Sequence, residues 1–522
     1  MSVAVAAAVS LGLGVLVSLV RPRFARVATG VGLVGLIAVA WLASEIRATD
    51  VLPFGSAALV GSETLRSFAA TWAACAALLV AIDALSVGSL AVAGPALIGL
   101  GAAILAIAST DASAAFAFLA AGGVVAVVAP AVAGARTRAL VAWRALRTVV
   151  VASFLGLGVI AWESSPAGPF AVGSGAADGV DPAAASTLGL GLIAIVAAVA
   201  LRMGAIPTHV WAARLVEAIP AAAVPAALAW GGAAFAIVAA GWAIAALGPG
   251  VALLGVERGL VAIVAGGTIV LGATAALLHD DIDHVIGYTI VAAGGFGLLA
   301  FATLDPSAAP LLAAWLVAYG ALASGFAGWA TAVRGRFGVR TLAELHGWAR
   351  RSPLLATALV LVTAGLVGLP AGGAAAARGG LVGLALDPPY DAVALLGALG
   401  PALVFGRVLR AGLERPSDVV ARAPSERPRL DSQTRRPTST RSPVALARAV
   451  ATAAKGERTF IAASLALALA VLASAVSLTS TAAPGSKDGS PVPSASPAAS
   501  TFEQSERGQS PGASAQRSMS RS

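Results

Sequence analysis

Runs of about twenty apolar residues follow one another along most of this chain, separated by short polar or helix-breaking segments. A helix that crosses a bilayer needs about 20 predominantly apolar residues, so each run is a candidate membrane span. The pattern predicts about fourteen spans, at residues 3–20, 28–46, 68–86, 90–109, 113–134, 140–162, 184–203, 221–247, 257–278, 285–303, 309–331, 354–385, 391–412 and 459–480.

The charges between the runs predict an orientation. If the N-terminus lies outside, the odd-to-even connections face the cytoplasm, and these are rich in arginine: 21–26, 136–147, 334–351 and 413–458. The connection at 163–183 contains three acidic residues and no Lys or Arg. Because positively charged loops face the cytoplasm, the alternation predicts an even number of spans with both termini outside. The N-terminal charges follow the first apolar run, which favours an uncleaved helix over a signal peptide.

Composition agrees with this interpretation. Hydrophobic residues make up 58% of the chain and charged residues 11%, whereas soluble domains carry about 25% charged residues. We therefore expect an all-α polytopic membrane protein. Its net charge of +9 is concentrated in loops and does not indicate nucleic-acid binding. The expected organisation is a transmembrane bundle at 1–412, a basic flexible cytoplasmic linker at 413–458, a last transmembrane helix at 459–480 and a disordered Ser/Pro-rich tail at 481–522.

Two spans are interrupted by helix-breaking residues. Pro207 and Pro220 break the stretch after 184–203, and Pro370 lies inside 354–385 with several glycines. Non-helical backbone at membrane depth persists only where protein buries it or where it lines a wet cavity. Paired broken helices are typical of transporter ion sites, so the pattern predicts two inverted five-helix repeats.

Polar residues gather around the first break, within LRMGAIPTHVWAARLVEAIP at 201–220. The segment contains Arg202, His209, Arg214 and Glu217. Ionisable groups are costly in lipid, so an intramembrane one is a functional hypothesis by default.

The residues of this segment resemble a known family. Arg202-Met203-Gly204-Ala205-Ile206-Pro207-x-His209-x-Trp211 is similar to the Lys-Leu-x-x-x-Pro-Phe-His-x-Trp signature of antiporter-like membrane subunits. These are chains L, M and N of NADH-quinone oxidoreductase (complex I) and subunits of Mrp-type cation/proton antiporters. Further similar stretches occur in the family's order, at Ile82–Ser86, Glu217–Pro220, Asp281–Thr289, Leu342–Pro353 and Gly368–Pro370. The resemblance covers roughly residues 70–410 and favours chain N.

The resemblance implies fourteen spans and a chain of buried titratable groups: a Glu in the fifth span, Lys in the seventh and eighth, and Lys or Glu in the broken twelfth. Here the seventh-span lysine corresponds to Arg202, the eighth-span lysine falls near Gly232, and the twelfth-span lysine corresponds to Arg378. The fifth span contains no acid. Arginine stays protonated in proteins and is therefore a poor proton carrier.

Two interpretations remain open. In the first, the chain is a proton-translocating subunit of an NADH-quinone oxidoreductase-like respiratory complex. Its ion-path candidates are then Arg202, His209, Glu217, Arg378, Asp83, Asp111, Asp283 and His284. In the second, it is an Mrp-type cation/proton antiporter subunit or a diverged, non-conducting scaffold that has lost the lysine relay.

Several candidates also have ordinary structural explanations. His209 could cap a helix at the break, and Asp283 and His284 could lie in a solvated cytoplasmic loop. Arg378 could either be buried or extend to the outer interface.

The sequence contains no pattern for a catalytic, metal-binding or cofactor-binding site, so an independent enzyme is not expected. We expect NADH and quinone chemistry on partner subunits. The expected partners are other membrane subunits of a respiratory or antiporter complex, the lipid bilayer, and protons or monovalent cations. The expected location is the inner (plasma) membrane, as a multi-pass protein.

Overall fold

A computed structural model describes residues 2–479 of the chain, apart from 56, 89–91, 133–135, 164–181, 340, 388–389 and 415–442. These residues lie in one compact unit that extends from Met1 to Ala483. The predicted tail at 481–522 and most of the linker at 413–458 lie outside the described residues.

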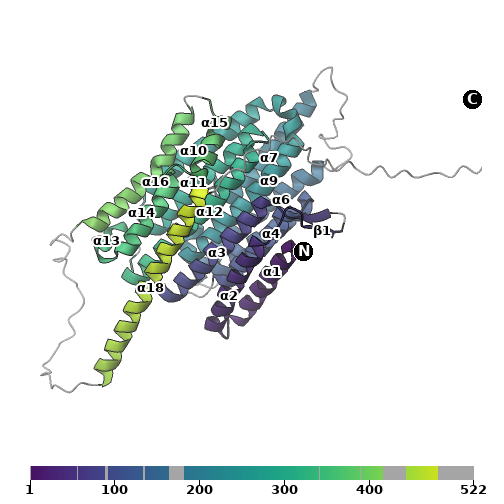
Figure 1. Ribbon diagram of the computed structural model, residues 1–522. Coiled ribbons are helices and arrows are strands. Elements are labelled where there is room, and N and C mark those ends of the chain that lie inside the picture. The colour runs from purple at the N-terminus through teal and green to yellow at the C-terminus, as the bar shows by residue number, and fades with distance from the viewer. Residues whose placement is uncertain are drawn as a thin grey trace, which may run out of the picture. The chain divides into compact units, whose positions relative to one another are not determined.

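The described part is a bundle of helices (Figure 1). Its first half contains α1 (Ser2–Val20), α2 (Ala25–Ser44), α3 (Glu63–Ser86), α4 (Ala93–Ala108), α5 (Ala112–Val132), α6 (Arg136–Glu163), α7 (Pro182–Met203) and α8 (Val210–Ala218). A 3₁₀ turn η2 (Ala221–Ala223) and a π-helical segment η3 (Pro225–Trp230) then lead into α9 (Gly231–Leu247).

The second half continues with η4 (Gly248–Leu253), α10 (Gly255–Leu278), α11 (Ile282–Thr303), α12 (Ala308–Phe337), η5 (Leu342–Leu345), α13 (Trp348–Arg351), α14 (Pro353–Val367), α15 (Gly373–Ala385), α16 (Tyr390–Leu413) and α18 (Pro443–Thr479). Helix α18 begins at Pro443, so residues 443–458 of the expected linker continue the last span as helix. Their Ala-rich sequence has high intrinsic helix propensity.

The predicted spans coincide with helices. Within the described residues, eleven helices are long and apolar enough to cross a membrane, and α4 and α14 are shorter apolar helices. The run at 354–385 is divided between α14 and α15, and the run at 391–412 corresponds to α16. The chain is therefore a multi-pass, all-α membrane protein, as the hydrophobic pattern predicted. The orientation of its termini remains a prediction.

One short hairpin interrupts the helical pattern. Strands β1 (Val51–Phe54) and β2 (Ala57–Val60) pair antiparallel between α2 and α3. The backbone N–H of Ala58 donates to Thr110 Oγ1 at 2.9 Å, which fastens the hairpin to the start of α5. The hydrophobic pattern did not predict this element.

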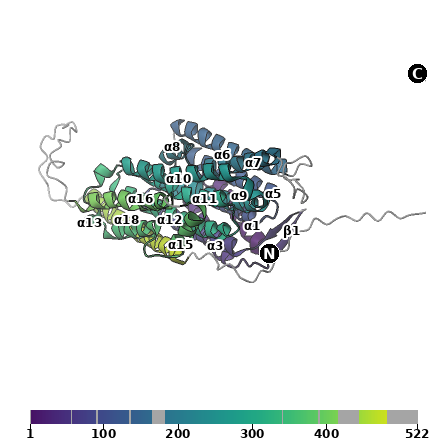
Figure 2. The ribbon, with the colours of Figure 1, turned by 90° about the horizontal axis from the view of Figure 1, so that it is seen from above.

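Helices α11 and α12 form the centre of the bundle and are buried along nearly all of their length (Figure 2). Beside them, the Trp230 ring stacks on Trp72 of α3, with centroids 5.7 Å apart, and its Nε1 donates to Ser324 Oγ of α12 at 3.0 Å. Gly320 provides the space for this contact, because a Cβ there would lie 2.7 Å from the Trp230 ring. The π-helical segment is thus locked between α3 and α12.

We expect Gly320→Ala to lower stability by about 1–3 kcal/mol, the usual cost of overpacking a core. The control is Gly241→Ala in α9, where nothing lies within 4 Å of the added methyl group. This change should be neutral or stabilising by up to about 1 kcal/mol, because alanine favours helix over glycine. Thermal unfolding of the detergent-solubilised protein measures both, and equal effects would contradict the packing argument.

Candidate functional site

The first helix break separates α7 from α8 and is secured by hydrogen bonds. The chain turns at Gly204, whose φ of +69° favours glycine, and the Ile206–Pro207 peptide is cis. Trp211 Nε1 of α8 donates back to Leu201 O of α7 at 2.9 Å, and the Ile206 N–H donates to Thr268 Oγ1 of α10 at 3.2 Å. The irregular backbone is therefore held by neighbouring helices, as burial in an apolar bundle requires.

Arg202 lies at the end of α7 and is only 2% exposed. Its Nη1 donates to Ala227 O at 2.9 Å, within the π-helical segment. Insertions of π-helix into α-helix leave backbone groups without their usual partners, and they are frequent at functional sites. Arg202 supplies a charged donor to a carbonyl of this segment.

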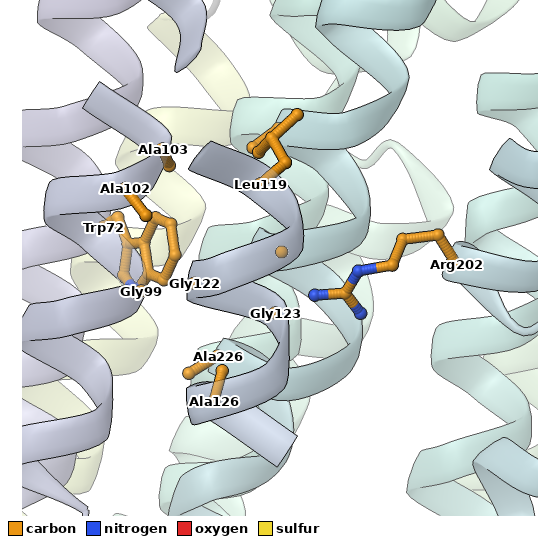
Figure 3. A pocket seen from close by; sticks show the side chains of 12 residues that line it. Trp72, Gly99, Ala102, Ala103, Leu119, Gly122, Gly123, Ala126, Arg202 and Ala226 are labelled. Atoms are coloured by element: carbon orange, nitrogen blue, oxygen red, sulfur yellow. The ribbon is translucent and has the colours of Figure 1, made fainter. Parts of the chain in front are cut away.

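A cavity of about 10 Å³, room for roughly one water molecule, lies at the Arg202 guanidinium (Figure 3). Trp72, Gly122, Gly123 and Gly231 are among the residues that line it, and none of the described lining residues is acidic. A Cβ at Gly123 of α5 would lie 3.1 Å from Arg202 Nη2, and a Cβ at Gly231 would clash with the same nitrogen. Glycines on two helices thus make room for the guanidinium, and a carbonyl oxygen is its hydrogen-bond acceptor.

The second helix break separates α14 from α15, and Arg378 closes it. Gly368 ends α14 with a φ of +96°, and the Leu369–Pro370 peptide is cis. Arg378 of α15 donates from Nη1 to Leu366 O and from Nη2 to Val367 O, both at 2.6 Å.

Aromatic rings complete the surroundings of Arg378. Its guanidinium carbon lies 5.3 Å from the Phe296 ring centroid and 5.5 Å from that of Trp315, within the range of a cation–π interaction. With 6% exposure, Arg378 is buried and does not extend to an interface. Arg202 and Arg378 therefore both bind backbone carbonyls at helix irregularities.

A cluster of titratable side chains lies where α8 meets the junction of α10 and α11; we call it the histidine cluster. His284 Nε2 lies 2.9 Å from Glu217 Oε1, and Arg214 lies 3.5 Å from Glu217. The His279 ring stacks on His284 with centroids 4.8 Å apart, and on Tyr288 at 5.0 Å. The cluster brings together Glu217 and His284, which the sequence analysis named separately.

His209 extends the cluster toward the first break. It is the N-cap residue of α8 without a capping side-chain bond, and its ring centroid lies 6.1 Å from that of Tyr288. His209 and Tyr288 line a cavity of about 270 Å³ together with Ile206 of the break. Three of the four histidines in the chain are thus connected by ring contacts, through Tyr288, from the α10–α11 junction to the first helix break.

Electrostatics at the junction oppose protonation of His279. Partial burial of its ring and the neighbouring His284 lower its pKa below the usual 6.5, outweighing the opposite effects of Asp281, Asp280 and Glu217.

The sequence analysis offered a solvated cytoplasmic loop as an explanation for Asp283, but the structure shows that this residue is buried. Asp283 is 7% exposed, and its carboxylate pairs with Arg334 of α12. It lies in the first turn of α11, and its backbone N–H donates to Oδ1 of the N-cap residue Asp281 at 2.8 Å. The structure thus makes Asp283 a buried link between α11 and α12.

The other two acidic candidates lie away from Arg202. Asp111 Oδ1 accepts the Ser113 N–H at 2.8 Å at the start of α5, about 18 Å along that helix from Gly123. Asp83 is 2% exposed near the end of α3, about 16 Å along the helix from Trp72. Neither aspartate is therefore a direct partner for the guanidinium in this arrangement.

The sequence analysis missed three aromatic or imidazole groups, His279, Tyr288 and Tyr319. Tyr319 of α12 is buried, and its hydroxyl has no hydrogen-bond partner among the described residues. It stacks on Trp315 at 6.4 Å and lies against Gly294, as Met203 does. Tyr319 thus lies between the surroundings of the two breaks. The chain contains only three tyrosines, and this rarity is the sequence feature that could have marked Tyr319 as a candidate.

Comparison with known proteins agrees with this geometry. Residues 181–378, which contain both broken helices, match the model of the family described as "NADH:quinone oxidoreductase/Mrp antiporter, TM". The chain is 32% identical over 197 residues to the NADH-quinone oxidoreductase subunit N 1 of Streptomyces griseus, a match over 37% of this chain and 40% of that relative. The chain thus spans less than half the length of this relative. The predicted resemblance is confirmed over this central part.

Solved structures share the fold over nearly the whole chain. A chain of respiratory complex I from Thermus thermophilus with bound NADH superposes with a TM-score of 0.64 at 18% identity, covering 90% of this chain and 99% of that one. A chain of the Mrp complex from a Dietzia species gives 0.58 at 16% identity, covering 90% and 97%. The fold is therefore that of antiporter-like membrane subunits.

We expect Arg378→Lys to destabilise the protein. The two guanidinium nitrogens of Arg378 each donate to a different carbonyl, and a single lysine ammonium cannot reproduce both hydrogen bonds in this geometry. Hydrogen bonds to charged groups contribute about 1.5–3 kcal/mol each. The control is Arg66→Lys, whose exposed pair with Glu63 is worth about 0–1 kcal/mol. Thermal unfolding in detergent measures both, and an equal loss in the two variants would show that Arg378 does not cap α14.

The lowered pKa of His279 predicts a dependence of stability on pH. Because the folded protein disfavours the protonated ring, this contribution is complete above the usual pKa of 6.5 and is lost as pH falls through the lower folded-state value. Unfolding temperatures measured from pH 7.5 to 5 should fall less steeply in His279→Gln. The control, His346→Gln, replaces the histidine outside the cluster and should retain the wild-type slope.

Proposed function

We propose that this chain, related over residues 181–378 to the NADH:quinone oxidoreductase/Mrp antiporter transmembrane family, is a proton-translocating membrane subunit of an NADH-quinone oxidoreductase-like respiratory complex. The observation that carries the proposal is the 32% identity to an NADH-quinone oxidoreductase subunit N over 197 residues, together with the family match at residues 181–378. The fold shared with a chain of complex I supports it.

The geometry suggests how protons would enter such a subunit. The His284–Glu217 pair can bind and release a proton, and His279 and Tyr288 lie within ring contact of it. His209 and its cavity continue this line to the first break. We propose the histidine cluster as the proton-loading group on the cytoplasmic side, where the arginine pattern orients this end of the bundle.

The two buried arginines would act as fixed charges in this scheme. Each remains protonated and bound to backbone carbonyls, so each can bias the movement of a proton without carrying it. Tyr319, between the breaks, offers a hydroxyl for passage or for an ordered water. The transported charge would therefore depend on histidine, carboxylate, tyrosine and water.

The arginine contacts also favour a second candidate function, a non-conducting scaffold subunit. Every hydrogen bond described for Arg202 and Arg378 goes to a backbone carbonyl, which is a structural role. The fold shared with the Mrp complex chain leaves a cation/proton antiporter subunit as a further alternative.

We further propose that NADH and quinone chemistry belongs to partner subunits and that the complex lies in the inner (plasma) membrane. The arginine-rich connections on one side of the predicted topology support insertion in such a membrane. Other membrane subunits are the expected neighbours, together with protons or monovalent cations.

Purification of the tagged chain in mild detergent tests the proposal. Peripheral NADH-oxidising subunits and quinone-reactive membrane subunits should co-purify and be identified by mass spectrometry. NADH-driven proton flux in proteoliposomes of this complex should fall at least about ten-fold in Glu217→Gln, since a positioned proton donor typically contributes about 100-fold or more.

The control for the flux measurement is Glu63→Gln, which removes an exposed carboxylate at the start of α3. Unchanged flux in both variants, with the complex intact, would favour the scaffold function. Proton flux that requires sodium and no NADH, in a preparation without redox subunits, would favour the antiporter function.

A further inference from the structure

A cleft of about 500 Å³ opens between α2, α3 and α18, away from the histidine cluster. Its described lining residues are Arg26 and Thr29 of α2, Ala84 and Leu85 of α3, Gly88 just after α3, and Arg458 of α18. Helix α3 packs against both α2 and α18, so the cleft lies where three helices meet.

The charges at this cleft are strongly unbalanced. Arg26 and Arg458 are exposed, and neither forms an ion pair with any residue that the structure describes. Arg21 and Arg23 lie in the turn that precedes α2, and Glu457 is the acidic neighbour of Arg458. Arginine binds phosphate with several directed hydrogen bonds, so this arrangement suits a phosphate group.

The two helices that supply the arginines also expose apolar residues further along their spans. Beyond Arg26, α2 exposes Val27, Val31 and Val34, and beyond Arg458, α18 exposes Phe460 and Ile461. On both helices the basic residue comes first and the exposed apolar residues follow along the span. A ligand with an anionic head and long apolar tails would match this order.

The predicted topology places all parts of the cleft on one side of the membrane. Helices α2 and α18 begin at the cytoplasmic side, and α3 ends there. Basic pockets between transmembrane helices on this side are suited to anionic lipid head groups.

We propose that the cleft between α2, α3 and α18 binds one anionic phospholipid, with its phosphate held by Arg26 and Arg458. The acyl chains extend from the cleft into the surrounding bilayer. The lipid joins the first hairpin of helices to the last span, which α3 contacts directly. The site is independent of proton movement, so it stands whether the subunit conducts or not.

The test titrates the full-length protein in detergent with dioleoylphosphatidylglycerol and follows the unfolding temperature and, by native mass spectrometry, the bound lipid. The anionic lipid should raise the unfolding temperature more than dioleoylphosphatidylcholine does. Each of Arg26→Gln and Arg458→Gln should weaken phosphatidylglycerol binding about five-fold, the effect of one basic residue near a lipid phosphate.

The matched control is Arg144→Gln with Arg147→Gln, which removes two exposed arginines of α6 that do not line the cleft. A second variant, Ala84→Trp, fills the cleft without changing its charge and should also abolish the preference for phosphatidylglycerol. It keeps the proposal testable if the arginine variants fold poorly.

Three results would overturn the proposal. Equal responses of the cleft variants and the α6 control would show diffuse binding to basic residues. Stabilisation by inorganic phosphate equal to that by phosphatidylglycerol would show a site for free anions. Equal stabilisation by the two lipids would show that the head-group charge does not matter.

Discussion

Backbone carbonyls that a broken helix leaves without partners inside an apolar bundle must still be hydrogen-bonded, because an unsatisfied polar group in an apolar interior is costly. Arg378 reaches back across its break to two such carbonyls. At the other break, Trp211 donates to Leu201 O, which also accepts the Gly204 N–H. Arg202 serves a carbonyl of the π-helical segment. Side chains that the sequence marks as ionic candidates thus hold the irregular backbone on which the site depends.

This constraint divides the polar groups into two kinds. The buried arginines provide positive charge that cannot be removed by deprotonation, so their effect on a proton path is electrostatic. Groups that can exchange a proton gather at the junction of α8, α10 and α11, where His284 meets Glu217 and His279 stacks on both His284 and Tyr288. Burial is lower there, and charging a histidine costs less than in the centre of the bundle.

The membrane spans could be predicted because their signal is local: an apolar run of sufficient length must either cross the bilayer or be buried. The signal for the helix breaks was also local, since glycine and proline mark their positions.

The histidine cluster could not be predicted in the same way. His284 and Glu217 are far apart in the chain and meet only because α8 packs against α11. From its sequence context Asp283 could lie in a loop, and only the structure shows that it is buried and paired with Arg334 of α12. The hairpin β1–β2 lacks an alternating pattern long enough to recognise.

The arginine at position 202 and its glycine neighbours form one packing unit. A guanidinium is larger than an ammonium and extends between α5 and α9, and Gly123 and Gly231 leave it the space. A larger side chain at position 123 would occupy that space, because a Cβ there would already lie 3.1 Å from Arg202 Nη2. A lysine at 202 alone would leave a void beside two glycines and a carbonyl with a weaker partner. The glycines and the Ala227 carbonyl therefore hold Arg202 in place, and because arginine stays protonated, proton exchange must begin at other residues.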